Sequence, residues 1–539
     1  MVHGALLVPQ VLRLIFQNLG PFFTPSLPEL FESTNLKSYE ILPKFSHSRM
    51  SLLSAALTCK SFMDPALDVL WWVMDDLEPL FQVVLRMVQI RVIHQPIAKS
   101  EIQAFVTYAN RVKLFILRGS STIHPSSYIQ VLQAIERMSI FPSLNYLLSL
   151  GSFPELHLLA TNCLIGFYGY SVRNPVGEPV PIDMWTFVRG LPASTNKLKF
   201  LELEYPVTKS CLDAISQLPE LQTIFIDDSN ESSSALGSAF FRSLSVRSKA
   251  AKLNLVTKGA LGNTVIAPNL AFACDFLTDL TFLCVEDGPA STHAPVGLQA
   301  IFRVIKLPRL HTLRISYPAV DESDLAVWKL FFKSLVTATP MLLALSLRAP
   351  FRLRSTTATT PKGVSLHQIS RLSKHPLVFL EDDNFFNLWS LDDCNFVVES
   401  WPSLTALTIG TIITFHMLTV LVSGLPNLYE LKIALSSKRL PDVEELPVVS
   451  HSPTVITLRP TFTAPDDPIH IATCLDKLCP FAEIWIVPQS ARLDPRGAWK
   501  QTGRILQALR SARLDGRERR PMSLKQLQIV YSKYTQTDF

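Results

Sequence analysis

Residues 401–435, WPSLTALTIGTIITFHMLTVLVSGLPNLYELKIAL, contain the same apolar phrase twice. The two copies start 24 residues apart and read Leu404-x-x-Leu407-x-Ile409 and Leu428-x-x-Leu431-x-Ile433. In a strand, residues two positions apart share one face, and the residues between them point to the opposite face. Each copy therefore predicts a short strand with one buried row of side chains and one exposed row.

The phrase returns along most of the C-terminal two thirds of the chain. Four further copies read Leu198-x-x-Leu201-x-Leu203, Leu221-x-x-Ile224-x-Ile226, Leu310-x-x-Leu313-x-Ile315 and Leu342-x-x-Leu345-x-Leu347. Weaker copies begin at Ala250 and at Leu280, and the second of these has Leu283 and Val285 as its inner pair. So short a strand cannot bury its apolar row alone, and stacking many of them side by side forms a solenoid.

These cycles of one strand and one helix resemble leucine-rich repeats over most of residues 198–530. The resemblance implies an α/β fold, a horseshoe-shaped solenoid with parallel strands on its concave face, and a surface that grips another macromolecule. We assign residues 141–539 to this solenoid and residues 81–140 to a helical connector. A generic α/β domain with parallel strands remains the alternative.

The composition excludes several other classes of protein. The chain has 539 residues, 48% of them hydrophobic, and a formal net charge of only +5, which does not favour nucleic acid as a partner. Its eight cysteines show no disulfide framework, and the N-terminus has no basic leader, so we expect a cytoplasmic or nuclear protein. The apolar stretch 404–425 could be mistaken for a membrane span, but its threonines and its repeat phrase favour a buried strand plus helix.

The first eighty residues follow a helical pattern instead of the repeat. An apolar stripe beginning at Val8 predicts one helix, residues 20–47 read as an irregular insertion, and a second helix resumes around Met50. Asp64 and Pro65 are typical of an N-cap and first helical position, so we expect them to open a third helix. Three short helices with apolar residues on more than one face need a partner to cover the surplus.

These residues resemble the F-box family, particularly its large fungal set. The matching blocks are Leu7-Val8-Pro9-Gln10-Val11-Leu12, Leu52-Leu53-x-Ala55-Ala56-Leu57-Thr58-Cys59-Lys60-x-Phe62 and Pro65-Ala66-Leu67-x-x-Leu70-Trp71. The family's opening Leu-Pro-x-Glu is altered here, with Val8 in place of proline and Gln10 in place of glutamate. The resemblance covers about residues 5–80, so we assign residues 1–80 to an F-box-like helical domain.

The resemblance implies a non-catalytic subunit of a Skp–cullin–F-box ubiquitin ligase, in the ubiquitin-like conjugation pathway. Its helices would bind the Skp adaptor, and through it the cullin, while the repeats would hold an unknown protein substrate. The positions expected to contact the adaptor are Leu7, Pro9, Leu14, Leu52, Cys59 and Trp71. For each of these positions, packing within the chain is the alternative. A leucine-rich scaffold without a ligase is the alternative for the whole chain.

The sequence contains no pattern that predicts an enzyme or a cofactor. It lacks Gly-x-Ser-x-Gly, Gly-x-x-x-x-Gly-Lys and His-Glu-x-x-His, and therefore the nucleophile, phosphate-loop and zinc-protease motifs. His470, Cys474 and Cys479 have the spacing of a helix with buried thiols, and we predict no metal there. The basic segment 496–520 is expected to be a solvated helix and loop, with a nuclear-import or nucleic-acid patch as the alternative.

The exposed row of each strand supplies the expected substrate contacts. These contacts are Phe200, Glu202, Phe225, Arg314 and Arg348. The aromatic rings would anchor a partner and the acidic side chains would form a charged rim around them. The row changes from mainly acidic to more basic along the chain, and the alternative is that so few charges follow this order by chance.

Overall fold

A computed structural model describes the structure of most of the chain. The described residues are 8–19, 45–85, 93, 96–118, 123–136, 139–170, 182–205, 207–228, 238–247, 249–258, 272–285, 294–317, 325–349, 366–386, 389–447, 449, 453–460, 467–487 and 497–516. The chain divides into two compact units, Met1–Lys252 and Leu253–Phe539. Each unit is described by itself below.

The first unit begins with three helices, α1 (Pro9–Gln17), α3 (Phe45–Thr58) and α4 (Lys60–Leu70). They share a small core. Its buried members are Leu12, Phe16, Leu52, Ala56, Ala66 and Val69. The expected start of the third helix was wrong, because α4 begins at Lys60 after the extended residue Cys59 and carries Pro65 in its interior. The predicted insertion at 20–47 lies mostly outside the described residues, but its last residues, from Phe45, already belong to α3.

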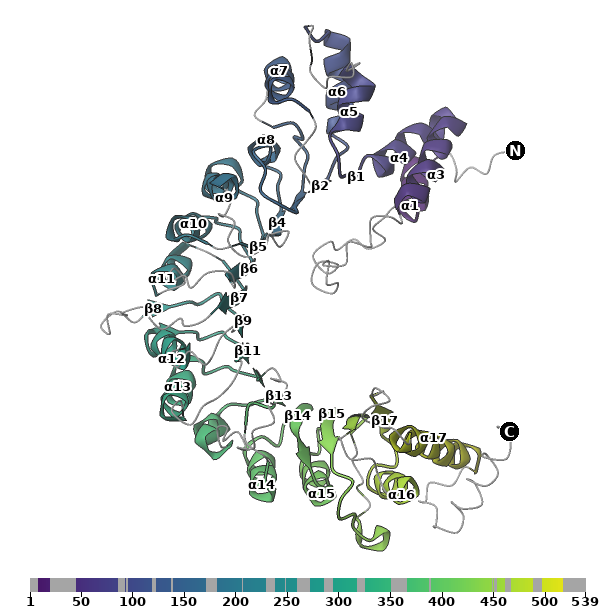
Figure 1. The fold of residues 1–539 in the computed structure, drawn as a ribbon, viewed down its shortest axis with the longest axis vertical. Helices are drawn as coiled ribbons and strands as arrows, with labels where there is room; N and C mark the ends of the chain where they lie inside the picture. Colours follow the sequence, from purple (N-terminus) through teal and green to yellow (C-terminus); the bar gives the residue numbers. More distant parts are fainter. Residues whose placement is uncertain are drawn as a thin grey trace. The chain divides into compact units, whose positions relative to one another are not determined.

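The rest of the first unit alternates strands and helices, and the helices lie on one side of the strands (Figure 1). The strands are β1 (Val73–Met74), β2 (Leu114–Leu117), β3 (Tyr146–Ser149), β4 (Gly166–Tyr170), β5 (Phe200–Glu204) and β6 (Thr223–Asp228). The helices are α5 (Glu78–Leu85), α6 (Lys99–Ala109), α7 (Pro125–Ile135), α8 (Leu156–Leu159), α9 (Ile182–Ser194), α10 (Lys209–Ile215) and α11 (Ser238–Arg247). Each strand from β1 to β6 pairs in parallel with the next. Strand β7 (Lys252–Lys258) contains the boundary between the units.

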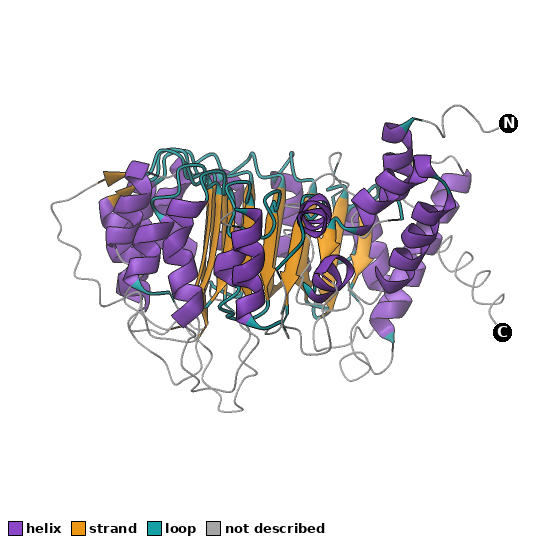
Figure 2. Ribbon diagram, turned by 90° about the horizontal axis from the view of Figure 1, so that it is seen from above, coloured by secondary structure: helices purple, strands orange, loops and turns teal. Residues whose placement is uncertain are grey.

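The second unit repeats this alternation of parallel strands and helices. Figure 2 shows helices in purple packed along strands in orange. Its main sheet contains β9 (Asp279–Val285), β11 (Thr312–Ser316), β12 (Ala344–Arg348), β13 (Phe379–Asp383), β14 (Ala406–Ile413), β15 (Glu430–Leu435), β16 (Val455–Pro460) and β17 (Glu483–Ile486). The helices are α12 (Ala294–Val304), α13 (Leu325–Ala338), η5 (Leu366–Lys374), α14 (Leu391–Ser400), α15 (Phe415–Gly424), η6 (Val443–Glu445), α16 (Pro468–Leu478) and α17 (Ala498–Gly516). A separate pair joins β8 (Phe272–Ala273) to β10 (Ile305–Lys306).

The repeat phrase forms the buried row of both units, as the sequence predicts. In the first unit Leu201 pairs with Ile224 and Leu203 with Ile226, and all four side chains are buried. In the second unit the buried row contains Leu313, Ile315, Leu345, Leu347, Leu407, Ile409, Leu431 and Ile433, in register from strand to strand. The n+3 and n+5 positions therefore face the covering helices, as expected for a leucine-rich-repeat-like α/β fold.

The copy predicted at Leu280 has the wrong register. Leu280 pairs with Leu313 and Phe282 with Ile315, so these two side chains form the buried row in place of Leu283 and Val285. Because side chains alternate along a strand, a shift by an odd number of residues exchanges the buried and exposed faces. The true copy starts at Leu277, three residues earlier.

The predicted domain boundary at 140/141 is also not where the repeats begin. Strands β1 and β2 already belong to the parallel sheet, so residues 81–140 are not a purely helical connector. The stretch 404–425 contains strand β14 and helix α15, which confirms the prediction of strand plus helix. Within the described residues, every helix is too short or too polar to cross a membrane.

Candidate protein-binding surfaces

The three N-terminal helices carry apolar side chains on an outer surface as well as in their core. On α3, Leu52 and Ala56 point into the core, while Met50, Leu53 and Leu57 form a second stripe at helical spacing. Leu57 is 79% exposed and Met50 is 64% exposed. A helix with apolar residues on two faces buries one of them within the chain and leaves the other available to a partner.

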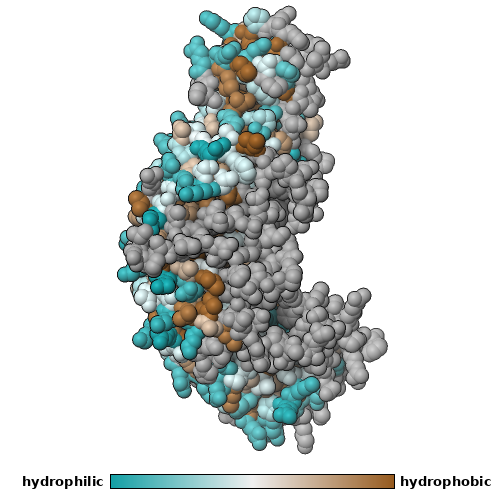
Figure 3. Space-filling model, turned by 60° about the vertical axis from the view of Figure 1, so that its left-hand side comes forward, coloured by the Kyte–Doolittle hydropathy of each residue, from teal (hydrophilic) through white to brown (hydrophobic). Residues whose placement is uncertain are grey.

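Exposed apolar residues occur elsewhere as isolated side chains. Figure 3 shows brown apolar areas dispersed among hydrophilic ones on the described surface that it presents. Ile182 begins α9 and Leu330 lies on α13, and both are exposed. Single exposed apolar residues of this kind are normal on soluble proteins, so they do not indicate a binding site by themselves. The stripe on α3 differs because three such residues repeat on one helix.

The predicted adaptor contacts have different positions in the structure. Leu7 lies outside the described residues, Pro9 and Cys59 are exposed, and Leu14 on α1 is 63% exposed. Trp71 is half-buried, and its ring centroid lies 4.9 Å from that of Tyr108 on α6.

Leu52 was assigned wrongly as a surface contact. It is only 1% exposed and belongs to the core that the three helices share. The sequence pattern does not distinguish the two faces of α3, because apolar residues occupy both. The neighbouring positions Met50, Leu53 and Leu57 form the accessible stripe instead.

Ion pairs fix helix α4 against the strands that follow it. Arg111, just before β2, pairs with Asp64 at 2.6 Å and also with Asp68, which in turn pairs with Arg13 on α1. Only 14% of the Arg111 side chain is exposed, whereas 69% of the Asp64 side chain is exposed. Asp64, expected to be an N-cap, therefore serves as an ion-pair partner.

On the first unit's sheet, the predicted substrate contacts lie on the face opposite the helices. Phe200 and Glu202 alternate with the buried Leu201 and Leu203 along β5, and Glu202 is paired in register with Phe225 on β6. Both phenylalanine rings are half-buried, so neither belongs to the fully buried core. They remain candidates for contact with a partner.

The same face carries tyrosines that the repeat phrase does not reveal. Tyr146 on β3, and Tyr168 and Tyr170 on β4, belong with Phe200 to a second hydrophobic cluster, in which Tyr168 is buried and the other three side chains are partly buried. Strand β4 follows the phrase only as far as Leu164-x-x-Phe167, with Gly169 at the third apolar position, so its copy is difficult to detect in the sequence. The aromatic character of the alternate positions is the signal that would have identified this cluster.

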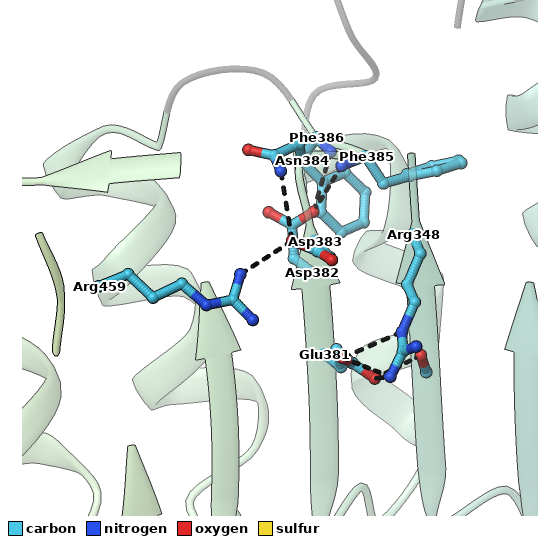
Figure 4. Close-up of polar contacts among 9 residues, drawn as sticks. Arg348, Glu381, Asp382, Asp383, Asn384, Phe385, Phe386 and Arg459 are labelled. Atoms are coloured by element: carbon cyan, nitrogen blue, oxygen red, sulfur yellow. Dashed lines mark hydrogen bonds and ion pairs between the residues drawn. The ribbon is translucent and has the colours of Figure 1, made fainter. Parts of the chain in front are cut away.

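In the second unit, Arg314 and Arg348 are both exposed on the corresponding strand face. Arg348 is committed to Glu381 of the neighbouring strand β13 (Figure 4), with Nε donating to Oε1 at 3.1 Å and Nη2 to Oε2 at 3.0 Å. Ser346 Oγ also donates to Oε2, at 2.6 Å. Side-chain exposure is 53% for Arg348 and 11% for Glu381. The arginine therefore neutralises a largely buried carboxylate, while part of its own side chain stays accessible to solvent.

Asp382 anchors the loop that leaves β13. Its Oδ1 accepts from the backbone N–H groups of Phe385 and Phe386, at 2.9 and 3.1 Å, and its Oδ2 accepts from the indole N–H of Trp389 at 2.7 Å. Figure 4 shows Phe385 and Phe386 beside this carboxylate. Burial raises the pKa of Asp382 to about 6, although the three hydrogen bonds favour the ionised form.

Asp383, the next residue, forms an ion pair with Arg459 at 3.1 Å (Figure 4). Arg459 lies on β16, so its side chain crosses β14 and β15 to reach β13. Gly410 on β14 leaves room for this contact, because a Cβ there would lie 2.9 Å from Asp383 Oδ1 and 2.7 Å from the Asn384 backbone nitrogen. A missing side chain thus permits a fixed charge pair on the sheet face.

The described part of the second unit presents several paired charges on its strands. Arg348 pairs with Glu381, Arg459 with Asp383, and Lys432 with Glu430. Such pairs suit the recognition of a polar partner more than they suit acid–base chemistry.

Several acidic and cysteine side chains of the second unit have structural roles. Asp393 forms a capping box with Ser390 at the start of α14, and Asp467 caps α16 through the backbone N–H groups of Ile469 and His470. Cys474 is buried on α16 and Cys479 is buried at its end. Among the described residues, no group of three histidine, cysteine or acidic side chains is placed to hold a metal ion.

The chain is similar to a solved structure but matches no known family. No family model matches the chain, and no curated protein matches it. Among solved structures, the chain is similar to one in the crystal structure of a TLR13–ssRNA13 complex, with 13% identity and a TM-score of 0.31. The match covers 72% of this chain and 69% of that chain.

Proposed function

We propose that this protein is the substrate-recognition subunit of a Skp–cullin–F-box ubiquitin ligase. In this proposal the N-terminal helices bind the Skp adaptor, and the strand faces of the repeats bind a protein substrate. Holding a substrate lysine near a charged ubiquitin-conjugating enzyme raises its effective concentration, so the chain needs no catalytic residue of its own.

The outer apolar surface of the three N-terminal helices carries this proposal. The helices already bury a core that includes Leu12 and Leu52. Leu14 nevertheless remains 63% exposed and Leu57 remains 79% exposed. Exposing large apolar side chains to water is unfavourable, and several such side chains on one small helical unit are typical of an interaction surface. The sequence blocks that resemble the F-box family fall on these same helices.

Direct binding between the purified full-length chain and a purified Skp adaptor tests the proposal. Isothermal titration calorimetry should show binding by the wild type. Leu14→Asp combined with Leu57→Asp should weaken it by about a hundredfold or more, because an apolar interface disfavours a buried carboxylate by several kcal/mol. Both positions are exposed, so the variant should keep its fold, which circular dichroism checks.

A matched control separates the interface from general effects of new charge. Leu330 on α13 is an exposed leucine in the second unit, and Leu330→Asp introduces the same carboxylate away from the helices. This control should bind the adaptor like the wild type. If the wild-type chain itself does not bind, the ligase proposal is lost.

The second candidate is a leucine-rich scaffold that binds proteins without a ligase. The observation that favours it is the altered start of α1, where Val8 is the N-cap and offers no side-chain hydrogen bond. A scaffold would bind its partners through the same strand faces, and Leu14→Asp with Leu57→Asp would leave that binding unchanged. The calorimetric experiment therefore distinguishes the two candidates.

A further inference from the structure

The main sheet of the second unit has an open edge at its last strand, β17. Among the described residues, β17 pairs only with β16, so its outer side has no partner strand there. An unpaired strand edge presents backbone N–H and C=O groups that can pair with a further strand. The last repeat of a solenoid also needs a further element to cover its apolar end.

The buried row of the sheet is incompletely covered at this edge. Ile456 and Leu458 on β16 are fully buried. They pair in register with Ile484 and Ile486 on β17, which are only half-buried. Helix α17 already lies against this row, since a Cβ at Gly503 would be 3.4 Å from Cδ1 of Ile486. The cover that the row still lacks is therefore on the side where a next strand would lie.

The chain that follows α17 contains a further copy of the repeat phrase. This copy reads Leu524-x-x-Leu527-x-Ile529 and lies outside the described residues. Helix α14 ends four residues before the phrase that begins at Leu404, and that distance suffices for the chain to return to the sheet. Eight residues separate Gly516, the end of α17, from Leu524, so this segment can reach the edge of β17.

We propose that residues 524–529 form the next parallel strand of the second unit and pair with the outer edge of β17. The register of the repeat phrase places Leu527 beside Ile484 and Ile529 beside Ile486. The two added side chains then complete the buried row at its open end. The inference does not rest on the proposed function, because it concerns how the repeat array ends.

The other row of the segment favours this occupant over a strand from another molecule. Gln526 and Gln528 alternate with the apolar residues and so belong to the opposite face. On β17 that face carries Glu483 and Trp485, and Trp485 is 58% exposed. One apolar row and one polar row match a strand that is buried on one side only. Because the segment is tethered to α17, it also pairs at a high effective concentration, which a second copy or a free peptide lacks.

Hydrogen–deuterium exchange of the full-length chain, followed by mass spectrometry, tests the pairing. Amides of residues 524–529 should exchange about tenfold or more slowly than those of an unstructured peptide. Leu527→Lys with Ile529→Lys should remove this protection and speed exchange in β17, because charges would enter the buried row. The matched control, Gln526→Lys with Gln528→Lys, adds the same charges to the opposite row and should keep the protection. Rapid exchange of this segment in the wild type, or equal loss in both variants, would overturn the inference.

A register-specific disulfide separates pairing within one chain from pairing between two chains. Residues in register on neighbouring strands lie about 5 Å apart, a distance that a disulfide can bridge. Trp485→Cys with Gln528→Cys should therefore form a disulfide within one chain under mild oxidation, detected by mass spectrometry as a linked pair of peptides. In the control, Trp485→Cys with Gln526→Cys, the shift of two residues separates the cysteines by about 8 Å and should lower the yield about tenfold. Links found only between two chains would assign the edge to a second copy, and either that result or equal yields from both pairs would overturn the inference.

Discussion

Asp382 places a carboxyl group in the buried row of the second unit's sheet, where the neighbouring side chains are apolar. It pairs in register with Leu347 and Ile409, and its side chain is fully buried. Burial raises its pKa from 3.8 to about 6. Since one pKa unit corresponds to about 1.4 kcal/mol, ionising Asp382 costs about 3 kcal/mol more in the folded chain than in the unfolded chain.

The direction of the pH effect follows from the raised pKa. Between about pH 4 and pH 6 the folded chain holds more proton at Asp382 than the unfolded chain does. The free energy of unfolding falls with rising pH wherever the folded state binds more protons. The stability that Asp382 contributes is therefore fully present below about pH 4 and is lost as the pH rises through about 6.

Urea unfolding of the wild type and of Asp382→Asn, followed by tryptophan fluorescence from pH 4 to pH 7.5, measures this effect. The wild-type free energy of unfolding minus that of the variant should fall by about 2 kcal/mol between pH 4 and pH 6.5. The amide also places an N–H against the indole N–H of Trp389, which adds an offset that does not vary with pH. A difference that stays constant or rises with pH would refute the reasoning.

Three further substitutions, and Leu14→Asp as a control, test the packing of both units. Leu431→Ala should lower the free energy of unfolding by about 2 to 5 kcal/mol in urea titrations, because it empties a fully buried position of the ladder. Gly410→Ala should lower it by about 1 to 3 kcal/mol, because its Cβ would meet the Asn384 backbone at 2.7 Å. Leu52→Asp should unfold the N-terminal helices, seen as a loss of far-ultraviolet circular dichroism, whereas Leu14→Asp should leave the signal unchanged.

The sequence predicted the buried ladder wherever both inner positions are apolar. Leu201, Leu203, Leu431 and Ile433 are examples, because period-2 burial is the strongest pattern that a parallel strand imposes. The prediction failed where a polar or small residue occupies the inner row. Strand β13 has Asp382 at the third apolar position, and it is stabilised there by three hydrogen-bond donors that the local sequence does not indicate.

The candidate surfaces could be predicted only in part. Phe200 and Phe225 were assigned to the correct face, since alternation fixes the side of the sheet on which each residue lies. The partner of Arg348 could not be predicted, because Glu381 belongs to a strand whose repeat copy is concealed by Asp382. Which face of α3 is buried also depends on how α1 and α4 pack against it, and a two-sided apolar helix does not specify this.

The most direct test of the proposed function is to purify the tagged full-length chain from cells and quantify the recovered proteins by mass spectrometry. The wild type should recover a Skp adaptor and a cullin, and Leu14→Asp with Leu57→Asp should lose both while it retains proteins held by the repeats. Absence of adaptor and cullin from the wild type, or their full retention by the variant, would contradict the account.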